Sequence, residues 1–256
     1  FLMDADKAYR FTIAWGRDTT TLDREGETTA TSDVRPTREA VEAALPAFIG
    51  EVDQIPPNFS AIKVDGERAY DLARDGVEFE LPTRKVSIFD LKVVDQPDAD
   101  HVTLTMECGK GTYVRALARD LGHRLGSCGH VTALRRLLVG PFGEDDMIPL
   151  ETLEDLGQCA PGEGLDEDHA SLILPVATAL DDIPALAVSR QDAARLRRGQ
   201  GVLLRGRDAP LFKGLVSVTS LGELVAIGEV ERGELLPKRV FNLAAEDPAA
   251  ASLERT

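Results

Sequence analysis

The segment from Cys108 to Gly122 constrains the fold of this chain more than any other part of the sequence. Apolar and polar residues alternate from Val102 to Cys108, which is the period of a half-buried strand. After the glycine pair at 109–111 the apolar residues recur at helical spacing, and Gly126 is placed to stop the helix. The sequence therefore predicts a strand, a tight Gly-Lys-Gly turn and a helix.

The predicted turn carries groups that attract an anion. Free backbone N–H groups at the start of a helix favour negative charge, and Lys110, Arg115 and Arg119 add full positive charges. A phosphodiester is a ligand that would fit there. The turn lacks the glycine, lysine and Ser/Thr order of an ATP-binding loop. Tyr113 also has a plainer interpretation, as a core tyrosine with a satisfied hydroxyl, and the pattern leaves both open.

Charge is distributed unevenly along the chain. A net charge of −15 argues against nonspecific binding to polyanions. Two basic islands nevertheless stand out, each with six arginines or lysines and a single acid, at 108–142 and 190–207. Each island taken singly is more typical of a solvated helix face, but the two together favour contacts to phosphates.

Composition limits the remaining functional classes. No apolar run approaches the length of a membrane span, and Phe1–Met3 leads directly into charged residues, which favours a soluble cytoplasmic protein. The three cysteines (Cys108, Cys128 and Cys159) are odd in number, widely separated and not in a Cys-x-x-Cys pair, so neither a disulfide framework nor a zinc site is indicated. We expect no metal and no cofactor.

The rest of the chain divides into segments of different pattern. Residues 9–15 alternate as a strand, and Thr37 is placed to cap a helix that Gly50 ends. A strand at 86–93 changes phase near Phe89 and Asp90, which predicts a β-bulge.

The C-terminal part of the chain is expected to form a separate unit. An acidic, proline-punctuated region leads to a short helix capped by Ser189 and closed by Gly199. Short strands with the spacing of a compact barrel or sandwich are then predicted at 202–204, 211–218, 224–230 and 235–241.

Several ordered motifs at characteristic spacing resemble one family, the bacterial tRNA pseudouridine synthases of the TruB type. No single motif would be specific, but their agreement in order makes a chance match improbable. The matching stretches are Asp-Lys-Ala-Tyr-Arg-Phe at 6–11, Phe-Ser-Ala-Ile-Lys at 59–63 with Gly66, Tyr70, Ala73 and Arg74, Gly-Thr-Tyr-Val-Arg at 111–115, Gly-His-Val-Thr-Ala-Leu-Arg-Arg at 129–136 and Pro-Lys-Arg-Val-Phe at 237–241.

The resemblance implies an α+β fold. It implies a pseudouridine synthase catalytic domain over 1–143 with a largely antiparallel mixed sheet, N-terminally incomplete, and an acidic connecting region over 144–184. A small PUA-like RNA-binding β domain would follow at 185–243, with a flexible tail at 244–256.

The resemblance also implies an isomerase that converts a T-loop uridine of tRNA, at the position numbered 55, to pseudouridine without a cofactor or metal. Because a paired or stacked base is inaccessible, such an enzyme flips it into a pocket. By similarity Tyr9 stacks on the base and removes the carbon-5 proton, and Arg115 pairs with the catalytic carboxylate. The resemblance further assigns Tyr113 and Leu134 to the base pocket, and Lys63, Lys110 and Arg136 to phosphate contacts.

One family motif is missing from the residues given. The nucleophilic aspartate of the family belongs to a Gly-x-Leu-Asp-Pro type motif upstream of the Asp-Lys-x-Tyr segment, and Asp4 and Asp6 align with other positions. We therefore expect the nucleophile to lie in an N-terminal segment outside this chain. The alternative is a catalytically incomplete fragment that binds tRNA through Tyr9, the basic islands and the C-terminal domain but does not isomerise uridine.

A different enzyme class also has a partial match. Ser60-Ala-Ile-Lys63 fits the Ser-x-x-Lys motif of penicillin-recognising acyl enzymes. The companion motifs are absent, because Ser32-Asp33 is followed by Val34 and residues 110–112 read Lys-Gly-Thr. The sequence therefore disfavours this class.

Overall fold

The computed structural model describes residues 2–64, 66–156, 172–204 and 213–243. The chain separates into two compact units, Phe1–Met147 and Ile148–Thr256. None of the helices in the described ranges is both long and apolar enough to cross a membrane.

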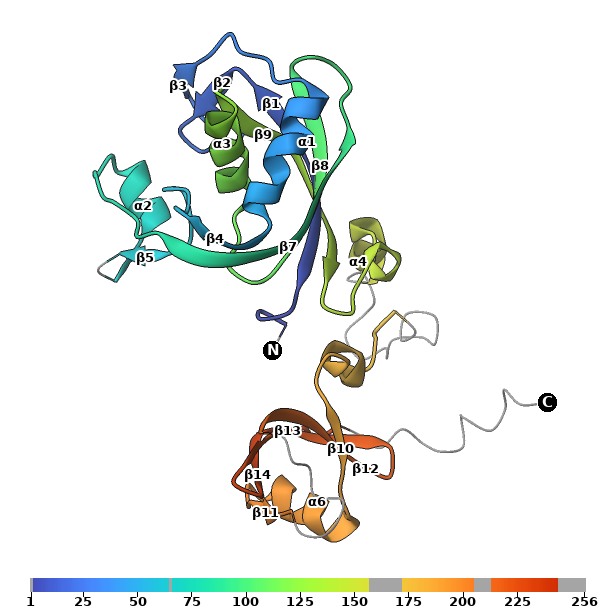
Figure 1. The fold of residues 1–256 in the computed structure, drawn as a ribbon. Coiled ribbons are helices and arrows are strands. Elements are labelled where there is room, and N and C mark those ends of the chain that lie inside the picture. The colour runs from blue at the N-terminus through green and yellow to red at the C-terminus, as the bar shows by residue number, and fades with distance from the viewer. Residues whose placement is uncertain (1, 65, 157–171, 205–212, 244–256) are drawn as a thin grey trace, which may run out of the picture. The chain divides into compact units, whose positions relative to one another are not determined.

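The first unit is built on a five-stranded sheet of order β4-β7-β8-β1-β9, in which every neighbouring pair is antiparallel (Figure 1). Two short hairpins, β2–β3 and β5–β6, accompany it. The strands are β1 Lys7–Trp15, β2 Arg17–Thr19, β3 Thr28–Thr31, β4 Gly50–Gln54, β5 Lys63–Val64, β6 Glu67–Arg68, β7 Arg84–Asp95, β8 His101–Cys108 and β9 Gly129–Val139.

The predicted strand, turn and helix are confirmed. Strand β8 ends at Cys108, and helix α3 runs over Val114–Arg124. Gly111 and Gly126 both have positive φ angles, of 79° and 71°, which glycine adopts without strain. The helix buries its apolar face, including Leu117 and Leu121, on one side of the sheet.

Helix α1 covers the same face of the sheet as α3. It spans Arg38–Ala44, and the predicted cap is present, since the Ala40 N–H donates to the Thr37 hydroxyl. A 3₁₀ helix, η1 Leu45–Phe48, continues it. The apolar residues of both helices form one core with the inward side chains of the strands: Phe11, Ile13, Val41, Ile88, Leu104 and Leu117 are among them.

The predicted phase slip in β7 is also confirmed. Its pairing with β8 shifts between Ile88 and Asp90, so one residue is inserted there. Phe89 is 52% exposed as a result of its place in this bulge. The shift lets both ends of the strand keep their apolar side chains on the core face.

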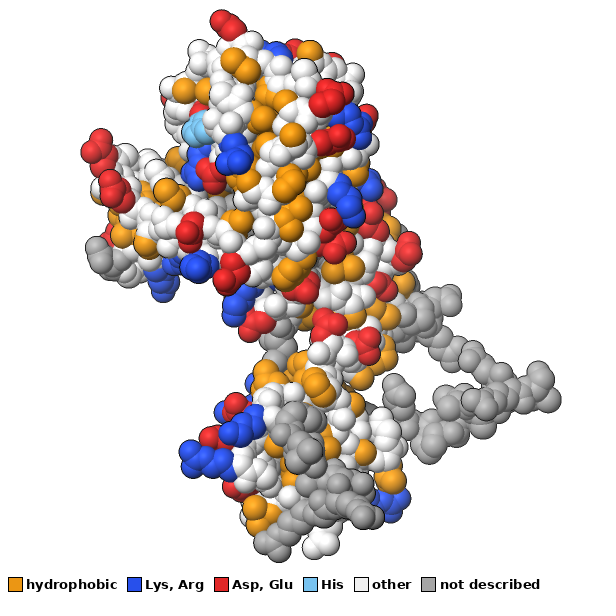
Figure 2. Space-filling view, viewed as in Figure 1, with side chains coloured by type: hydrophobic (Ala, Val, Ile, Leu, Met, Phe, Trp, Pro, Cys, Tyr) orange, Lys and Arg blue, Asp and Glu red, His pale blue; other side chains and the backbone are white. Residues whose placement is uncertain are grey.

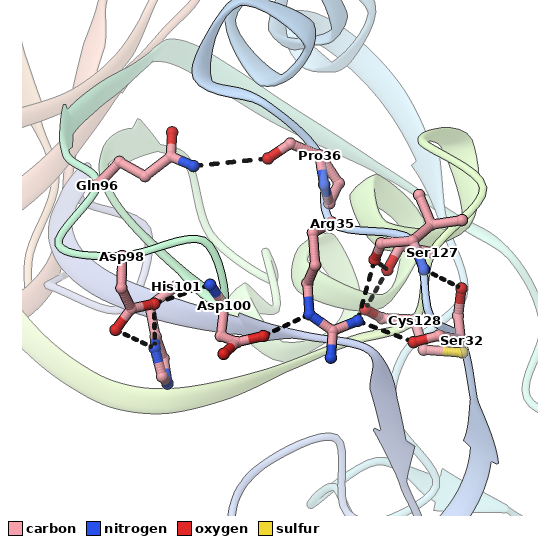
Figure 3. Close-up of polar contacts among 10 residues, drawn as sticks. Ser32, Arg35, Pro36, Gln96, Asp98, Asp100, His101, Ser127 and Cys128 are labelled. Carbon is pink, nitrogen blue, oxygen red and sulfur yellow. Dashed lines mark hydrogen bonds and ion pairs between the residues drawn. The ribbon is translucent and has the colours of Figure 1, made fainter.

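A polar network holds the segment between β3 and α1 against two turns of the first unit, the one between β7 and β8 and the one between α3 and β9 (Figure 3). Arg35 forms an ion pair with Asp100 and donates to the carbonyl oxygens of Ser32 and Val34. The Ser127 hydroxyl donates to the same Val34 oxygen at 2.8 Å. These bonds fix the connection to α1 at the end of the sheet where β1 stops.

The second unit contains its own five-stranded sheet, of order β10-β12-β13-β14-β11. Helix α6, Arg190–Arg197, packs Ala193 and Leu196 into its core, and Ser189 caps the helix as predicted. The remaining elements are η2 Glu144–Asp146 at the end of the first unit, then α4 Leu150–Leu156, η3 Val176–Leu180, β10 Ala185–Ala187, β11 Val202–Leu203, β12 Gly214–Ser220, β13 Glu223–Glu231 and β14 Glu234–Val240.

The predicted small β module is therefore present. Strand β12 is described only from Gly214, so the predicted start at 211 lies outside the described residues, as does the tail at 244–256. Strand β10 was not predicted, and it pairs in parallel with β12.

Two of the three cysteines lie among the described residues. Cys108 and Cys128 are buried and free, and Cys159 lies outside the described residues. Burial raises the pKa of the Cys108 thiol, which keeps it in the unreactive protonated form.

Helix α3 approaches β9 so closely that two glycines are required. A Cβ on Gly122 would lie 2.8 Å from the backbone nitrogen of Gly129. We expect Gly122→Ala to lower the free energy of unfolding by about 1–3 kcal/mol, although alanine is the better helix former. Chemical denaturation measures the change. Gly109→Ala is the matched control, because its Cβ would meet no atom nearer than 3.6 Å, and an equal loss in both variants would contradict the packing argument.

Candidate functional site

Arg115 joins three separate segments of the first unit. It lies in the first turn of α3, where its side chain is 25% exposed. Its Nη1 donates to the Thr21 carbonyl oxygen at 2.8 Å and to Asp23 Oδ2 at 3.1 Å. Its Nη2 donates to the Phe59 carbonyl oxygen at 2.9 Å. The guanidinium is therefore held in one orientation by the β2–β3 loop on one side and the Phe59 segment on the other.

Asp23 is a site residue that the sequence reasoning missed. Its Oδ1 accepts hydrogen bonds from the Thr21 hydroxyl at 2.5 Å and the Glu25 N–H at 3.1 Å. The loop also pairs with β9, since the Val131 N–H donates to the Leu22 carbonyl oxygen at 3.1 Å. Leu22 has a φ of 61°, an uncommon conformation for a residue other than glycine. The loop is thus built to hold a carboxylate against Arg115.

A cavity of about 470 Å³ opens beside this ion pair. That volume lies within the range of small-ligand sites and accommodates a single base. Leu134 lines the cavity and is 51% exposed, so an apolar surface faces the charged pair. The cavity is lined by Asp23, Arg24, Glu25, Arg115, Val131, Thr132, Ala133 and Leu134.

Tyr9 and Arg136 meet on the strands next to this cavity. Tyr9 is on β1 and is only 8% exposed, and it packs among the core residues. The Arg136 guanidinium carbon lies 5.4 Å from the centroid of the Tyr9 ring. Leu134 is paired with Phe11, two residues further along β1. The structure therefore brings Tyr9, Leu134 and Arg136 onto adjacent positions of one antiparallel pair.

Tyr113 precedes α3 and is fixed through its backbone. Its N–H donates to Gln54 Oε1 at 2.8 Å, and Gln54 Nε2 donates to the Tyr113 carbonyl oxygen at 3.1 Å. Gln54 is 3% exposed at the end of β4. This reciprocal pair of hydrogen bonds sets where α3 begins. No sequence pattern pointed to Gln54.

The two predicted lysines lie apart from the cavity lining. Lys63 is exposed on the β5–β6 hairpin, and Lys110 is exposed in the turn before α3, where its Nζ lies 2.7 Å from Asp4 Oδ1. The Ser60 hydroxyl is buried and has no hydrogen-bond partner among the described residues. An acyl-enzyme serine needs its lysine as a partner, so the geometry gives that class no support.

Charges are mixed in the cavity lining, where Asp23 and Glu25 lie with Arg24 and Arg115. Figure 2 shows acidic and basic side chains close together on the visible face of the first unit. No group of His, Cys, Asp and Glu in the part of the chain that the structure describes is arranged to hold a metal ion.

His130 is a buried neutral histidine behind the site. Its Nδ1 lies 2.8 Å from the Arg17 carbonyl oxygen, which requires an N–H there, and its Nε2 lies 3.5 Å from the Arg17 guanidinium. Burial lowers the pKa of His130, because the charged form loses its water.

We therefore expect stability to depend on this histidine below neutral pH. The unfolded chain takes up the proton near pH 6.5 and the folded protein does so only at lower pH, so stability is constant above about pH 6.5 and falls below it. The slope from one proton is at most about 1.4 kcal/mol per pH unit. His130→Gln should flatten the dependence of the urea midpoint between pH 7 and 5, whereas His101→Gln, at a partly exposed position, should not. Equal slopes in all three proteins would count against a buried neutral His130.

Comparison with known proteins identifies the family. Residues 1–114 match the N-terminal domain of the TruB family pseudouridylate synthases, and residues 115–181 match the tRNA pseudouridylate synthase B C-terminal domain. The chain is 69% identical over 250 residues to a protein of Caulobacter vibrioides named tRNA pseudouridine synthase B, covering 95% of this chain and 78% of that protein. It is 60% identical over 256 residues to the protein of the same name from Bradyrhizobium diazoefficiens, covering 100% of this chain and 73% of that protein.

Solved structures agree on the fold. A Cbf5-Nop10-Gar1 complex contains a chain that aligns with a TM-score of 0.69 and 23% identity, over 93% of this chain and 66% of that one. A chain of an H/ACA RNP bound to a substrate RNA containing 2′-deoxyuridine aligns with a TM-score of 0.68 and 21% identity, over 94% and 67%. The two domain matches together span well over half of the chain, and this chain therefore belongs to the TruB family of pseudouridylate synthases.

Proposed function

We propose that this protein isomerises a T-loop uridine of tRNA, at the position numbered 55, to pseudouridine. The observation that carries the proposal is the arginine–carboxylate pair, Arg115 with Asp23, at the wall of a cavity of about 470 Å³ that Leu134 lines. The 69% identity to a protein named tRNA pseudouridine synthase B supports the same reaction.

The reaction redistributes bonds within one nucleotide. The bond from ribose carbon 1′ to uracil nitrogen 1 breaks, the uracil turns, and carbon 5 joins carbon 1′. Carbon 5 loses its proton and nitrogen 1 gains one, so the reaction needs no electron donor or acceptor. We assign proton removal from carbon 5 to the Tyr9 phenol, acting as a general base by position.

Arg115 has hydrogen-bonding capacity left for a second carboxylate. Three acceptors bind its two terminal nitrogens, while its Nε has no partner among the described residues. The Nε and Nη2 edge of a guanidinium binds a carboxylate in a bidentate manner. We propose that this edge orients the family's nucleophilic aspartate and keeps it ionised, with Asp23 holding the opposite edge.

The remaining roles concern how the tRNA is held. Tyr113 and Leu134 are assigned to the base pocket, and the exposed Lys63 and Lys110, with Arg136, to phosphates. On α6 and its C-cap the side chains of Arg190, Arg195, Arg197 and Arg198 are exposed, which supports an RNA-binding role for the PUA-like second unit. Because the proposed substrate is tRNA, we propose a cytoplasmic location.

The test is tritium release from tRNA labelled at uridine carbon 5, with the intact mass of the expressed protein measured on the same sample. Release that disappears when uridine 55 is replaced by cytidine supports the proposal. Binding of tRNA without release by a protein whose mass includes an aspartate-bearing N-terminal segment would overturn the proposed reaction. The same result at the mass of residues 1–256 alone would leave a fragment that only binds tRNA.

A further inference from the structure

The contact between Arg136 and Tyr9 depends on an irregularity in the sheet. Ala8 pairs with Leu138, and a regular antiparallel register would then place Leu137 opposite Tyr9. Instead the register shifts between Ala8 and Tyr9, and Arg136 becomes the partner of Tyr9. Because side chains alternate between the two faces, this one-residue bulge turns Arg136 to the face that carries the tyrosine ring.

The neighbouring arginine makes a different contact. Arg135 pairs with Arg10 on the other face of the strands and forms an ion pair with Glu144. For Arg136, no carboxylate of the described residues lies within ion-pair distance, and the ring of Tyr9 is the contact that the structure gives it. A planar guanidinium stacks on an aromatic face in a way that a lysine ammonium does not.

We propose that Arg136 is a positioning residue for Tyr9. Its guanidinium lies over the Tyr9 ring, and Tyr9 belongs to the same core cluster as Phe11 and Met106. The ring is thereby held in one plane before the base arrives. This inference rests on the proposed function, in which the Tyr9 hydroxyl meets carbon 5 of the flipped uracil.

The first test observes Tyr9 directly and does not require catalysis. The chain has three tyrosines, Tyr9, Tyr70 and Tyr113, so ring-¹³C-labelled tyrosine gives a spectrum with few signals. Arg136→Gln and Arg136→Lys should both shift the Tyr9 ring signals and leave those of Tyr70 and Tyr113 in place. Arg135→Gln is the matched control and should not move the Tyr9 signals, since its side chain lies on the other face.

The second test separates positioning from phosphate binding. In Arg136→Lys, which keeps the charge but not the planar stack, kcat for tritium release should fall by about tenfold to a hundredfold with KM changed less than about threefold. A raised KM with unchanged kcat would mean that Arg136 acts only on phosphate, and would overturn the proposal. Unmoved Tyr9 signals in Arg136→Gln would overturn it as well. If the wild-type protein released no tritium, the proposed function would fail, while the spectra would still decide the contact.

Discussion

Arg115→Ala should reduce tritium release from tRNA to background, a loss in kcat/KM of about 10³-fold or more. The guanidinium binds the carbonyl oxygens of Thr21 and Phe59 as well as Asp23, so its removal takes away the group that joins the β2–β3 loop to the Phe59 segment. The Asp23 carboxylate would also lose its cationic partner. The nucleophilic aspartate would lose the guanidinium edge that is proposed to orient it. Steady-state release assays on the purified variant measure the effect.

The affinity for tRNA should change much less than turnover in this variant. Most phosphate contacts are expected from the other lysines and arginines, so the dissociation constant should rise by less than about tenfold at a fixed salt concentration. Arg115→Lys is the informative companion, because lysine restores the charge but cannot bridge three acceptors. Rapid turnover by Arg115→Lys would show that positive charge alone is required. The proposed bidentate binding of the nucleophilic carboxylate by the guanidinium would then be wrong. A cooperative thermal transition in both variants is needed to attribute the loss to the site.

The sequence predicted the parts of the fold that depend on neighbouring residues. The alternation before Cys108, the glycine turn and the period of α3 all lie within one short stretch, and the structure confirms each of them. The caps at Thr37 and Ser189 are also local, since each hydroxyl bonds a backbone N–H three residues on. The bulge in β7 was visible because the apolar phase changes within the strand itself.

The site was less accessible to sequence reasoning because its contacts join distant residues. Asp23 is 92 positions from Arg115, and Gln54 is 59 from Tyr113, so no local pattern links either pair. A retrospective signal for Asp23 exists in the Thr-Thr-Thr-Leu-Asp run at 19–23, where hydroxyls can support a carboxylate turn. The stacking of Arg136 on Tyr9 depends on a bulge whose position the strand pattern of β9 does not reveal.

Tyr9→Phe should also remove tritium release, by about 10²-fold to 10⁴-fold, the range typical of a lost general base. Phenylalanine keeps the ring that packs in the core and the face that Arg136 covers, so only the hydroxyl changes. Alanine would be a poorer choice, because truncating a buried aromatic residue costs about 3–5 kcal/mol and confuses folding with chemistry. Release of tritium from carbon 5 reports the proton removal that the hydroxyl is assigned.

Tyr70→Phe is the matched control for the loss of a hydroxyl. Tyr70 is 45% exposed and its ring packs edge-on against Phe59 at 5.8 Å, away from the cavity lining. The Tyr70→Phe variant should release tritium at the wild-type rate. Both Tyr70→Phe and Tyr9→Phe should bind tRNA as the wild type does, since neither change removes a positive charge. If Tyr9→Phe turned over normally, the base would have to be another group, and Tyr9 would keep only a stacking role. If Tyr9→Phe bound tRNA normally but released no tritium, the hydroxyl would be required for the chemical step, because the ring that stacks would still be present.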